Sequence, residues 1–169
     1  MGHDPAYAAA AAALGGGLAQ AGIRLVYGGG RNGLMGVLAD AAMAAGGEVV
    51  GVIPAFLMGW EVGHTGLPSL EVTDDMHTRK KRMFDLAEAF IALPGGIGTL
   101  DETIEVIAWR QLRQHARPVL LCDVAGSAQP LATLLRAVTE QGFVRDTETP
   151  LFECLDGPEA VLARLAALD

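Results

Sequence analysis

The sequence predicts an α/β fold with three layers, in which helices cover both faces of a parallel β-sheet. Segments with apolar residues at helical spacing alternate with short apolar runs along the 169 residues. These runs, of which 119–123 is an example, are continuously apolar rather than alternating, which is typical of strands buried on both faces. The length fits one compact domain, residues 1–169, and no linker or repeat interrupts it.

The helices are predicted from apolar residues three or four positions apart and from the residues at their ends. Asp4 and Pro5 are typical of an N-cap and a first helical position, and Gly22 fits the end of that first helix. Further helices are expected at 33–45, 75–88, 99–115, 130–141 and 158–167.

The strands are predicted from short apolar runs that stop at glycine, proline or charged residues. They are expected at 23–27, 48–53, 70–73, 90–93 and 119–123. A loop rich in glycine and proline covers 54–68. Ligands of parallel α/β proteins bind beyond the carboxyl ends of the strands, so the residues that follow each strand are the first candidates for a site.

Composition excludes several classes of partner. The formal net charge of −8 argues against nucleic-acid polymers and anionic membranes, which need a basic surface. The alanine run at 8–13 is too short to span a membrane and lacks the basic start of a signal peptide. Cys122 and Cys154 form no metal-binding or disulfide pattern, which suits a cytoplasmic protein. No metal site is expected, because His3, His64 and His115 lack ligand spacing.

A glycine-rich turn follows the strand at 23–27. Gly28, Gly30 and Gly33 form a G-x-G-x-x-G pattern between a strand and a helix, where backbone can approach a phosphate closely. A dinucleotide site also needs an acidic residue at the end of the next strand, where this chain has Pro54. The turn therefore predicts phosphate or ligand contact without NAD. The alternative is a tight turn with close packing.

A second glycine-rich turn, residues 94–99, follows the strand at 90–93. Three glycines in four positions exceed what a helix start requires, and a second helix N-terminus in the same sheet suggests a shared anionic ligand. The alternative explanation concerns Thr99 and Glu102, which have the T-x-x-E spacing of a capping box. That box would account for Glu102 without any chemistry.

One arginine falls on the apolar side of the predicted helix 75–88. At 100° per residue, Arg79 lies within the stripe formed by Met76 and Met83, and Lys80 lies on its edge. A buried guanidinium is costly unless it is paired, so Arg79 needs a protein carboxylate or a ligand phosphate. The alternative is an arginine whose stem is buried while its head group reaches solvent.

These motifs together resemble the LOG (Lonely guy) family of cytokinin riboside 5′-monophosphate phosphoribohydrolases. Its signature is an Arg-Lys pair followed by P-G-G-x-G-T-x-x-E, which here is Arg79–Lys80 and 94–102. The resemblance covers about residues 4–145. Proteins of this kind have often been labelled possible lysine decarboxylases. Only Lys80 and Lys81 are present, and neither stands in a convincing Schiff-base context.

The resemblance implies a Rossmann-like fold, a homodimer, no cofactor and hydrolysis of the N-glycosidic bond in N6-substituted adenosine 5′-monophosphates. It implies that Arg79 and Glu102 are catalytic. The residues that would bind the nucleotide substrate come from the basic helix, the loop at 54–68 and the two glycine turns. They are Glu61, Lys80, Gly96, Ile97, Gly98, Thr99, Leu100 and Asp101, together with Gly29 and Gly30 of the first turn.

Two features of the sequence leave alternatives open. Family members have a first strand ahead of the Gly-His-Asp-Pro-like segment, whereas this sequence starts at that segment, so the first strand is expected to be missing. A broader nucleoside-monophosphate glycosidase and a non-catalytic nucleotide-binding protein are the alternative functions. The helix at 99–115 is apolar on two sides, which fits either a dimer interface or a fully buried helix.

Overall fold

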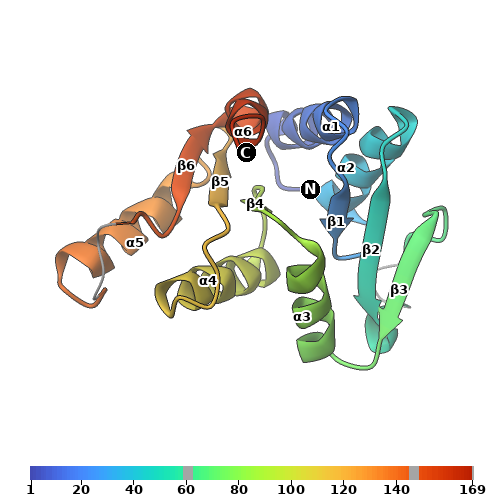
Figure 1. Ribbon diagram of the computed structural model, residues 1–169. Helices are drawn as coiled ribbons and strands as arrows, with labels where there is room; N and C mark the ends of the chain where they lie inside the picture. The colour runs from blue at the N-terminus through green and yellow to red at the C-terminus, as the bar shows by residue number, and fades with distance from the viewer. Residues whose placement is uncertain (59–62, 145–148, 169) are drawn as a thin grey trace. The chain divides into compact units, whose positions relative to one another are not determined.

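The computed structural model describes residues 1–58, 63–144 and 149–168 and confirms a layered α/β protein with parallel sheets (Figure 1). Contacts along the chain divide it into two compact units, residues 3–87 and residues 88–167. Each unit contains a three-stranded parallel sheet with its own helices. The single domain expected over residues 1–169 stays a prediction.

The first unit follows a β-α-β pattern with the strand order β1-β2-β3. Residue pairs such as Val26 with Val50, and Ile53 with Val72, set the register of the parallel sheet. The elements are α1 (Pro5–Gln20), β1 (Leu25–Tyr27), α2 (Gly33–Ala44), β2 (Val49–Pro54), the 3-10 helix η1 (Ala55–Leu57), β3 (Ser69–Thr73) and α3 (Met76–Leu86).

Side-chain caps begin two of the helices, and the sequence predicted the one at Asp4. The Asp4 carboxylate accepts a hydrogen bond from Ala6 N at 2.8 Å, and the Asp75 carboxylate accepts one from Thr78 N at 2.8 Å. The Thr78 amide holds the pKa of Asp75 below its ordinary value. The cap at Asp75 fixes where α3 starts and therefore which of its residues face the sheet.

Helices α1 and α2 approach one another closely because their contact is made of small residues. A Cβ atom on Gly15 would lie 2.3 Å from the carbonyl oxygen of Leu38, closer than atoms pack. One turn away, Ala11 is fully buried, and on α2 so is Ala39. The alanine- and glycine-rich first helix is therefore a packing surface of the first unit.

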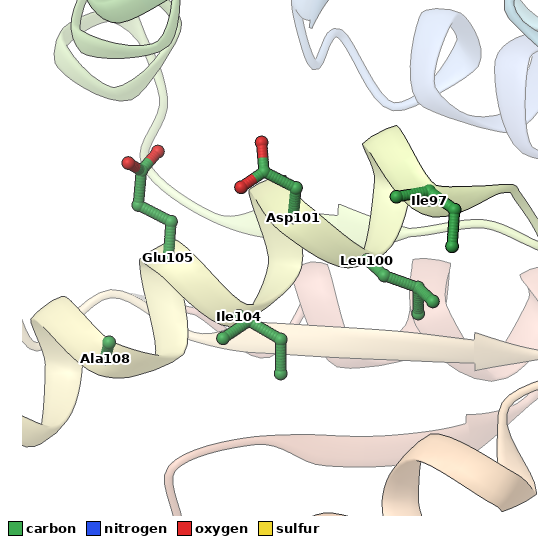
Figure 2. Close-up of a pocket in the computed structure, with 6 residues that line it drawn as sticks. All are labelled: Ile97, Leu100, Asp101, Ile104, Glu105 and Ala108. Atoms are coloured by element: carbon green, nitrogen blue, oxygen red, sulfur yellow. The ribbon is translucent and has the colours of Figure 1, made fainter.

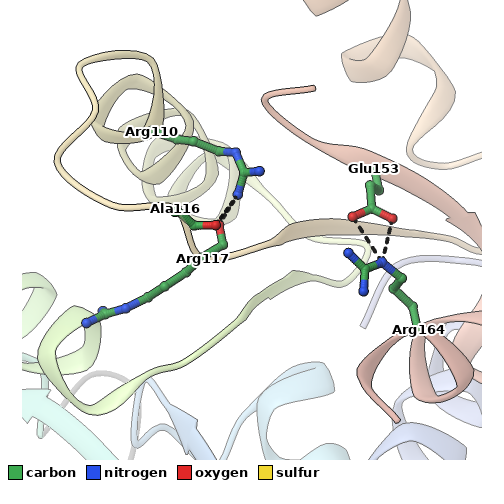
Figure 3. A network of polar contacts seen from close by, with 5 residues as sticks. All are labelled: Arg110, Ala116, Arg117, Glu153 and Arg164. Atoms are coloured by element: carbon green, nitrogen blue, oxygen red, sulfur yellow. Dashed lines mark hydrogen bonds and ion pairs between the residues drawn. The ribbon is translucent and has the colours of Figure 1, made fainter. Parts of the chain in front are cut away.

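The second unit has the strand order β4-β5-β6. Two polar contacts tie its elements together (Figure 3). Arg164 Nε donates to Glu153 at 2.8 Å, and Arg110 Nη1 donates to the carbonyl oxygens of Ala116 and Arg117. The elements are β4 (Phe90–Ala92), α4 (Ile97–Gln111), β5 (Val119–Asp123), α5 (Gln129–Glu140), β6 (Glu153–Asp156) and α6 (Gly157–Leu165).

The structure differs from the predicted elements at a few places. Strand β6 was not predicted, because its four residues have only two apolar side chains, flanked by Glu153 and Asp156, and none of them is buried. Helix α4 begins at Ile97, two residues before the expected start. Residues 1–24 contain no strand, and β1 and β4 each lie at one edge of their sheet. In the described ranges, no helix is both long and apolar enough to cross a bilayer.

The core of the second unit is aliphatic, and it contains one of the two cysteines. Leu120, Leu121 and Cys122 of β5 are almost fully buried. Burial, with a smaller effect of Asp123, raises the pKa of Cys122 to about 11. The Cys122 thiol therefore stays protonated near neutral pH and behaves as an apolar core residue, as the sequence indicated.

Two neighbouring glycines of α1 give a test of the helix contact. Gly15→Ala should lower the free energy of unfolding by about 1–3 kcal/mol, because the new Cβ collides with backbone of α2. Gly16→Ala should raise it by about 0.5–1 kcal/mol, because no atom lies within 4 Å and alanine favours the helix. Urea unfolding followed by circular dichroism measures both changes. Equal effects of the two substitutions would contradict the close approach.

Candidate functional site

The first glycine turn is buried and packs directly against Arg79. Gly28, Gly29 and Gly30 are all buried. A Cβ atom on Gly28 would lie 2.2 Å from Arg79 Nη2, so any side chain there would displace the guanidinium. Gly29 has φ +72°, a conformation that favours glycine. A Cβ atom on Gly29 would lie 3.1 Å from the Cβ atom of Ile53. The close packing that was the alternative explanation of this turn is therefore present.

Arg79 is only 6% exposed and is the one residue of α3 that is buried. Its Nε donates to the carbonyl oxygen of Val52 on β2 at 3.1 Å. The head group lies beside Gly28 rather than in solvent, so the interpretation as an arginine that reaches solvent is wrong. A guanidinium stays charged in proteins, so the first unit keeps a positive charge beneath its glycine turn.

The other charged residues of α3 face outward, as the helical angles predicted. Lys81 pairs with Asp85 at 2.5 Å on the exposed side of the helix. Arg82 makes two hydrogen bonds to Glu71 of β3, at 2.6 and 2.8 Å, and these bonds lower the pKa of the Glu71 carboxyl. Lys80 is half-buried next to Arg79. The basic run thus divides into an inward arginine and a solvated surface.

A histidine that sequence reasoning considered only as a metal ligand also lies at the first turn. His64 is 3% exposed, and its backbone N–H donates to the carbonyl oxygen of Gly29 at 2.9 Å. Its ring Nε2 lies 2.9 Å from a carboxylate oxygen of Asp40 on α2. Burial, and then the nearby Asp40, raise the pKa of Tyr27, whose buried hydroxyl has no hydrogen-bond partner among the described residues. The sequence does not single out His64, because a lone histidine in a loop belongs to no recognisable motif.

The second glycine turn begins α4 in a different way. The N-cap residue is Gly96, which offers no side-chain hydrogen bond, and Thr99 lies inside the first helical turn. Thr99 is therefore not an N-cap, and the capping-box explanation of Glu102 is wrong. Thr99 Oγ1 lies against Gly95, where a Cβ would come within 2.1 Å, and Thr103 Oγ1 donates to the Thr99 carbonyl at 2.7 Å.

The start of α4 is open to solvent. Gly96 and Gly98 are exposed, and a Cβ on either would have no atom within 4 Å. Leu100 and Asp101 are also exposed, while Glu102 is half-buried. Backbone N–H groups at an exposed helix start favour an anion, and glycine leaves them accessible. Among the described residues no packing contact accounts for Gly96 or Gly98, in contrast to Gly28.

The outer face of α4 carries a shallow pocket of about 380 Å³ (Figure 2). Leu100 and Ile104 lie side by side along the helix, while Asp101 and Glu105 point in another direction. Ile97 is 82% exposed. Ile107 and Thr103 are buried, whereas Leu100 and Ile104 are exposed, so the alternative of a fully buried α4 is wrong. The pocket is lined by Ile97, Leu100, Asp101, Ile104, Glu105 and Ala108.

The remaining predicted site residues fall into three groups. Gly29 and Gly30 lie together with Arg79 and Lys80 in the first unit. Residues 96–102 lie together at the start of α4 in the second unit. Glu61 lies outside the described residues. Within those residues no group of three His, Cys, Asp or Glu side chains is arranged to hold a metal ion.

The fold and the two turns define a class, namely a parallel α/β protein with two glycine-rich strand-to-helix turns and a buried arginine beneath one of them. The family model described as "Possible lysine decarboxylase" matches residues 35–165. A cytokinin riboside 5′-monophosphate phosphoribohydrolase of Rhodococcoides fascians is 42% identical over 164 residues, which cover 96% of this chain and 83% of that protein. The chain belongs to the LOG family, as its signature indicated.

Plant proteins of the same name are similarly close. The Arabidopsis thaliana enzyme LOG7 is 45% identical over 143 residues, covering 85% of this chain and 66% of that one. A probable enzyme of Oryza sativa subsp. japonica, LOG4, is 42% identical over 164 residues, covering 97% and 71%. The family model's description implies pyridoxal phosphate, which needs a lysine in a cofactor cavity. Lys81 is exposed and paired with Asp85, and Lys80 adjoins Arg79, so neither lysine fits that cofactor.

Solved structures with the same fold carry other names. A molybdenum cofactor binding protein of Rippkaea orientalis superposes with a TM-score of 0.71 at 22% identity, covering 97% of this chain and 88% of that one. The molybdenum cofactor carrier protein of Chlamydomonas reinhardtii gives 0.68 at 21% identity, covering 95% and 86%. At this identity the likeness confirms the Rossmann-like fold, and function has to be argued from the site.

The open glycines at the start of α4 give a second prediction. Gly96→Ala and Gly98→Ala should leave thermal stability nearly unchanged, because a Cβ meets no protein atom. Each should weaken AMP binding by about tenfold, if the open backbone is where the phosphate approaches. Isothermal titration calorimetry measures the affinity, with Gly16→Ala of α1 as the control. Unchanged affinity in both variants would show that the ligand does not use this backbone.

Proposed function

We propose that the protein hydrolyses the N-glycosidic bond of N6-substituted adenosine 5′-monophosphates, releasing the free base and ribose 5-phosphate. The relatives that are 41–45% identical over most of the chain are named for this activity. The observation that carries the proposal is the buried charge of Arg79 beneath Gly28. A positive charge kept out of water next to a glycine turn suits a phosphorylated substrate, because it strengthens attraction to an anion.

The proposed chemistry assigns separate roles to the two turns. Water adds to C1′ of the ribose while the bond from C1′ to the base nitrogen breaks, and the base leaves with a proton. The transition state resembles an oxocarbenium ion, which a nearby carboxylate stabilises. Glu102 is half-buried on α4 and is not used in a capping box, so we assign it this role.

The anionic end of the substrate is assigned to backbone and cations. In the second unit the exposed turn 96–98 offers N–H groups that suit an anion, and in the first unit Lys80 and Arg79 supply positive charge. The family resemblance assigns both sets of residues to the substrate. Thr99, Leu100, Asp101, Gly29 and Gly30 complete the proposed substrate contacts.

The test of the activity is release of free base from isopentenyladenosine 5′-monophosphate and from AMP, separated by chromatography. Arg79→Ala and Glu102→Gln should each lower kcat/KM by about 10²–10³-fold, because each removes a charge that acts in the transition state. Glu102→Gln should leave the melting temperature unchanged. Glu105→Gln, one turn further along α4, and Arg82→Gln, on the outer side of α3, are matched controls expected to keep near wild-type turnover.

The same measurement separates the alternative functions. Equal turnover of AMP and the N6-substituted nucleotide would indicate a broader glycosidase. Binding of both nucleotides without base release from the wild type would indicate a nucleotide-binding protein instead. Near wild-type turnover in Glu102→Gln would overturn the role of Glu102.

We further propose that the protein forms a homodimer through the outer face of α4. Ile97, Leu100 and Ile104 are 82%, 39% and 40% exposed, and they form one apolar stripe at helical spacing. Apolar residues grouped on one face of a helix are typical of a protein interface. The partner that we propose is a second copy of this chain, because the family resemblance implies a homodimer.

Light scattering after size-exclusion chromatography tests the dimer. The wild type should have twice the mass of one chain, and Ile104→Glu should shift it toward the monomer, because a charge in an apolar contact is costly. Leu134→Glu is the control, since Leu134 is 59% exposed on α5, outside the stripe. A monomeric wild type would overturn the proposal.

A further inference from the structure

His64 joins the loop that begins at residue 63 to the first glycine turn through its backbone. Its N–H donates to Gly29 O at 2.9 Å, and Gly63 pairs with Gly30 in an antiparallel bridge. A peptide unit is planar, with its carbonyl oxygen and N–H on opposite sides. The bond from His64 to Gly29 O therefore turns the N–H of Gly30, which belongs to the same peptide unit, away from the loop.

The side chain of His64 fastens the same residue to a second element. Ring Nε2 donates to Asp40 Oδ1 at 2.9 Å, and Asp40 belongs to α2, the helix that starts at Gly33 directly after the turn. This hydrogen bond is part-buried, because the His64 side chain is 4% exposed whereas that of Asp40 is 58% exposed. The loop is thus attached to the turn by backbone and to the following helix by a side chain.

The position of this turn matters because its glycines are closely packed against neighbouring residues. Gly28 lies against Arg79 Nη2, and Gly29 lies against Ile53 with a positive φ. A shift of the loop would carry the Gly29–Gly30 peptide with it. The Gly28 backbone would then move relative to the guanidinium beneath it.

We propose that His64 is a positioning residue for the nucleotide site, which orients the Gly29–Gly30 peptide through its N–H and is held in place by Asp40. The inference rests on the proposed function for the identity of the ligand, but the orientation of the turn can be measured without it. The hydrogen bonds of His64 join it to the turn and to α2, so its proposed effect is on binding geometry.

The experiment combines hydrogen exchange with kinetics on the full chain. In His64→Ala the backbone bond to Gly29 O can still form, but the hydrogen bond that ties residue 64 to Asp40 is lost. The amides of residues 28–33 should therefore exchange about tenfold faster. The dissociation constant for AMP and the KM for isopentenyladenosine 5′-monophosphate should rise about tenfold, with a smaller change in kcat. His64→Gln, which keeps an N–H donor for Asp40, should restore most of the binding.

Asp40 and a second histidine provide the controls. Asp40→Asn keeps an acceptor and should behave like the wild type, while Asp40→Ala should match His64→Ala, and the double variant should be no worse than either. His115 makes a similar hydrogen bond, from its ring Nε2 to Val106 O at 2.8 Å in the second unit. His115→Ala should leave exchange at 28–33 and the affinity for AMP unchanged.

The outcomes separate this inference from the proposed activity. Unchanged exchange at residues 28–33 in His64→Ala, or an equal increase in His115→Ala, would overturn the positioning role. Faster exchange with unchanged AMP affinity would also overturn it, because the turn would then not serve the ligand. If the exchange and affinity changes occur as expected and the wild type releases no base, positioning is supported and the proposed hydrolysis is wrong.

Discussion

The guanidinium of Arg79 sets the main constraint on the first unit. A buried cation loses its hydration and has to recover that free energy from groups of the protein. The hydrogen bond from Arg79 Nε to the Val52 carbonyl oxygen, at the centre of a fully buried strand, returns part of that free energy. The head group also needs room, which exists because Gly28 has no side chain. The cap at Asp75 then fixes the helical phase that turns residue 79 inward.

The two glycine-rich turns look alike in sequence and answer different physical needs. Gly28 is required by the protein itself, since Arg79 occupies the place of a side chain. Gly96 and Gly98 face open space, so no packing contact within the described residues accounts for them. One turn therefore holds a charge in place, while the other leaves backbone accessible. Either a fixed cation or a set of accessible N–H groups can bind an anion.

Local signals explain which parts of the molecule the sequence could predict. Asp4 and Gly22 mark the ends of the first helix by short-range chemistry, and the angle of Arg79 follows from helical geometry alone. Strand β6 was not predicted, because it is stabilised by pairing with β5, which is distant in the sequence. His64 was not predicted for the same reason, since its partners Gly29 and Asp40 are 35 and 24 positions away. The capping-box alternative failed because Gly96 started the helix earlier.

The fold itself does not select a reaction, since proteins named for binding molybdenum cofactor share it at 20–22% identity. The reaction has to be determined by side chains that the stability of the fold does not require. Arg79 is a candidate for such a side chain, because a buried charge is often no more stable than an apolar side chain of similar volume. The proposed function gives its charge beneath Gly28 a role, which is attraction of an anionic ligand. His64, which fastens the turn above that charge, belongs to the same arrangement.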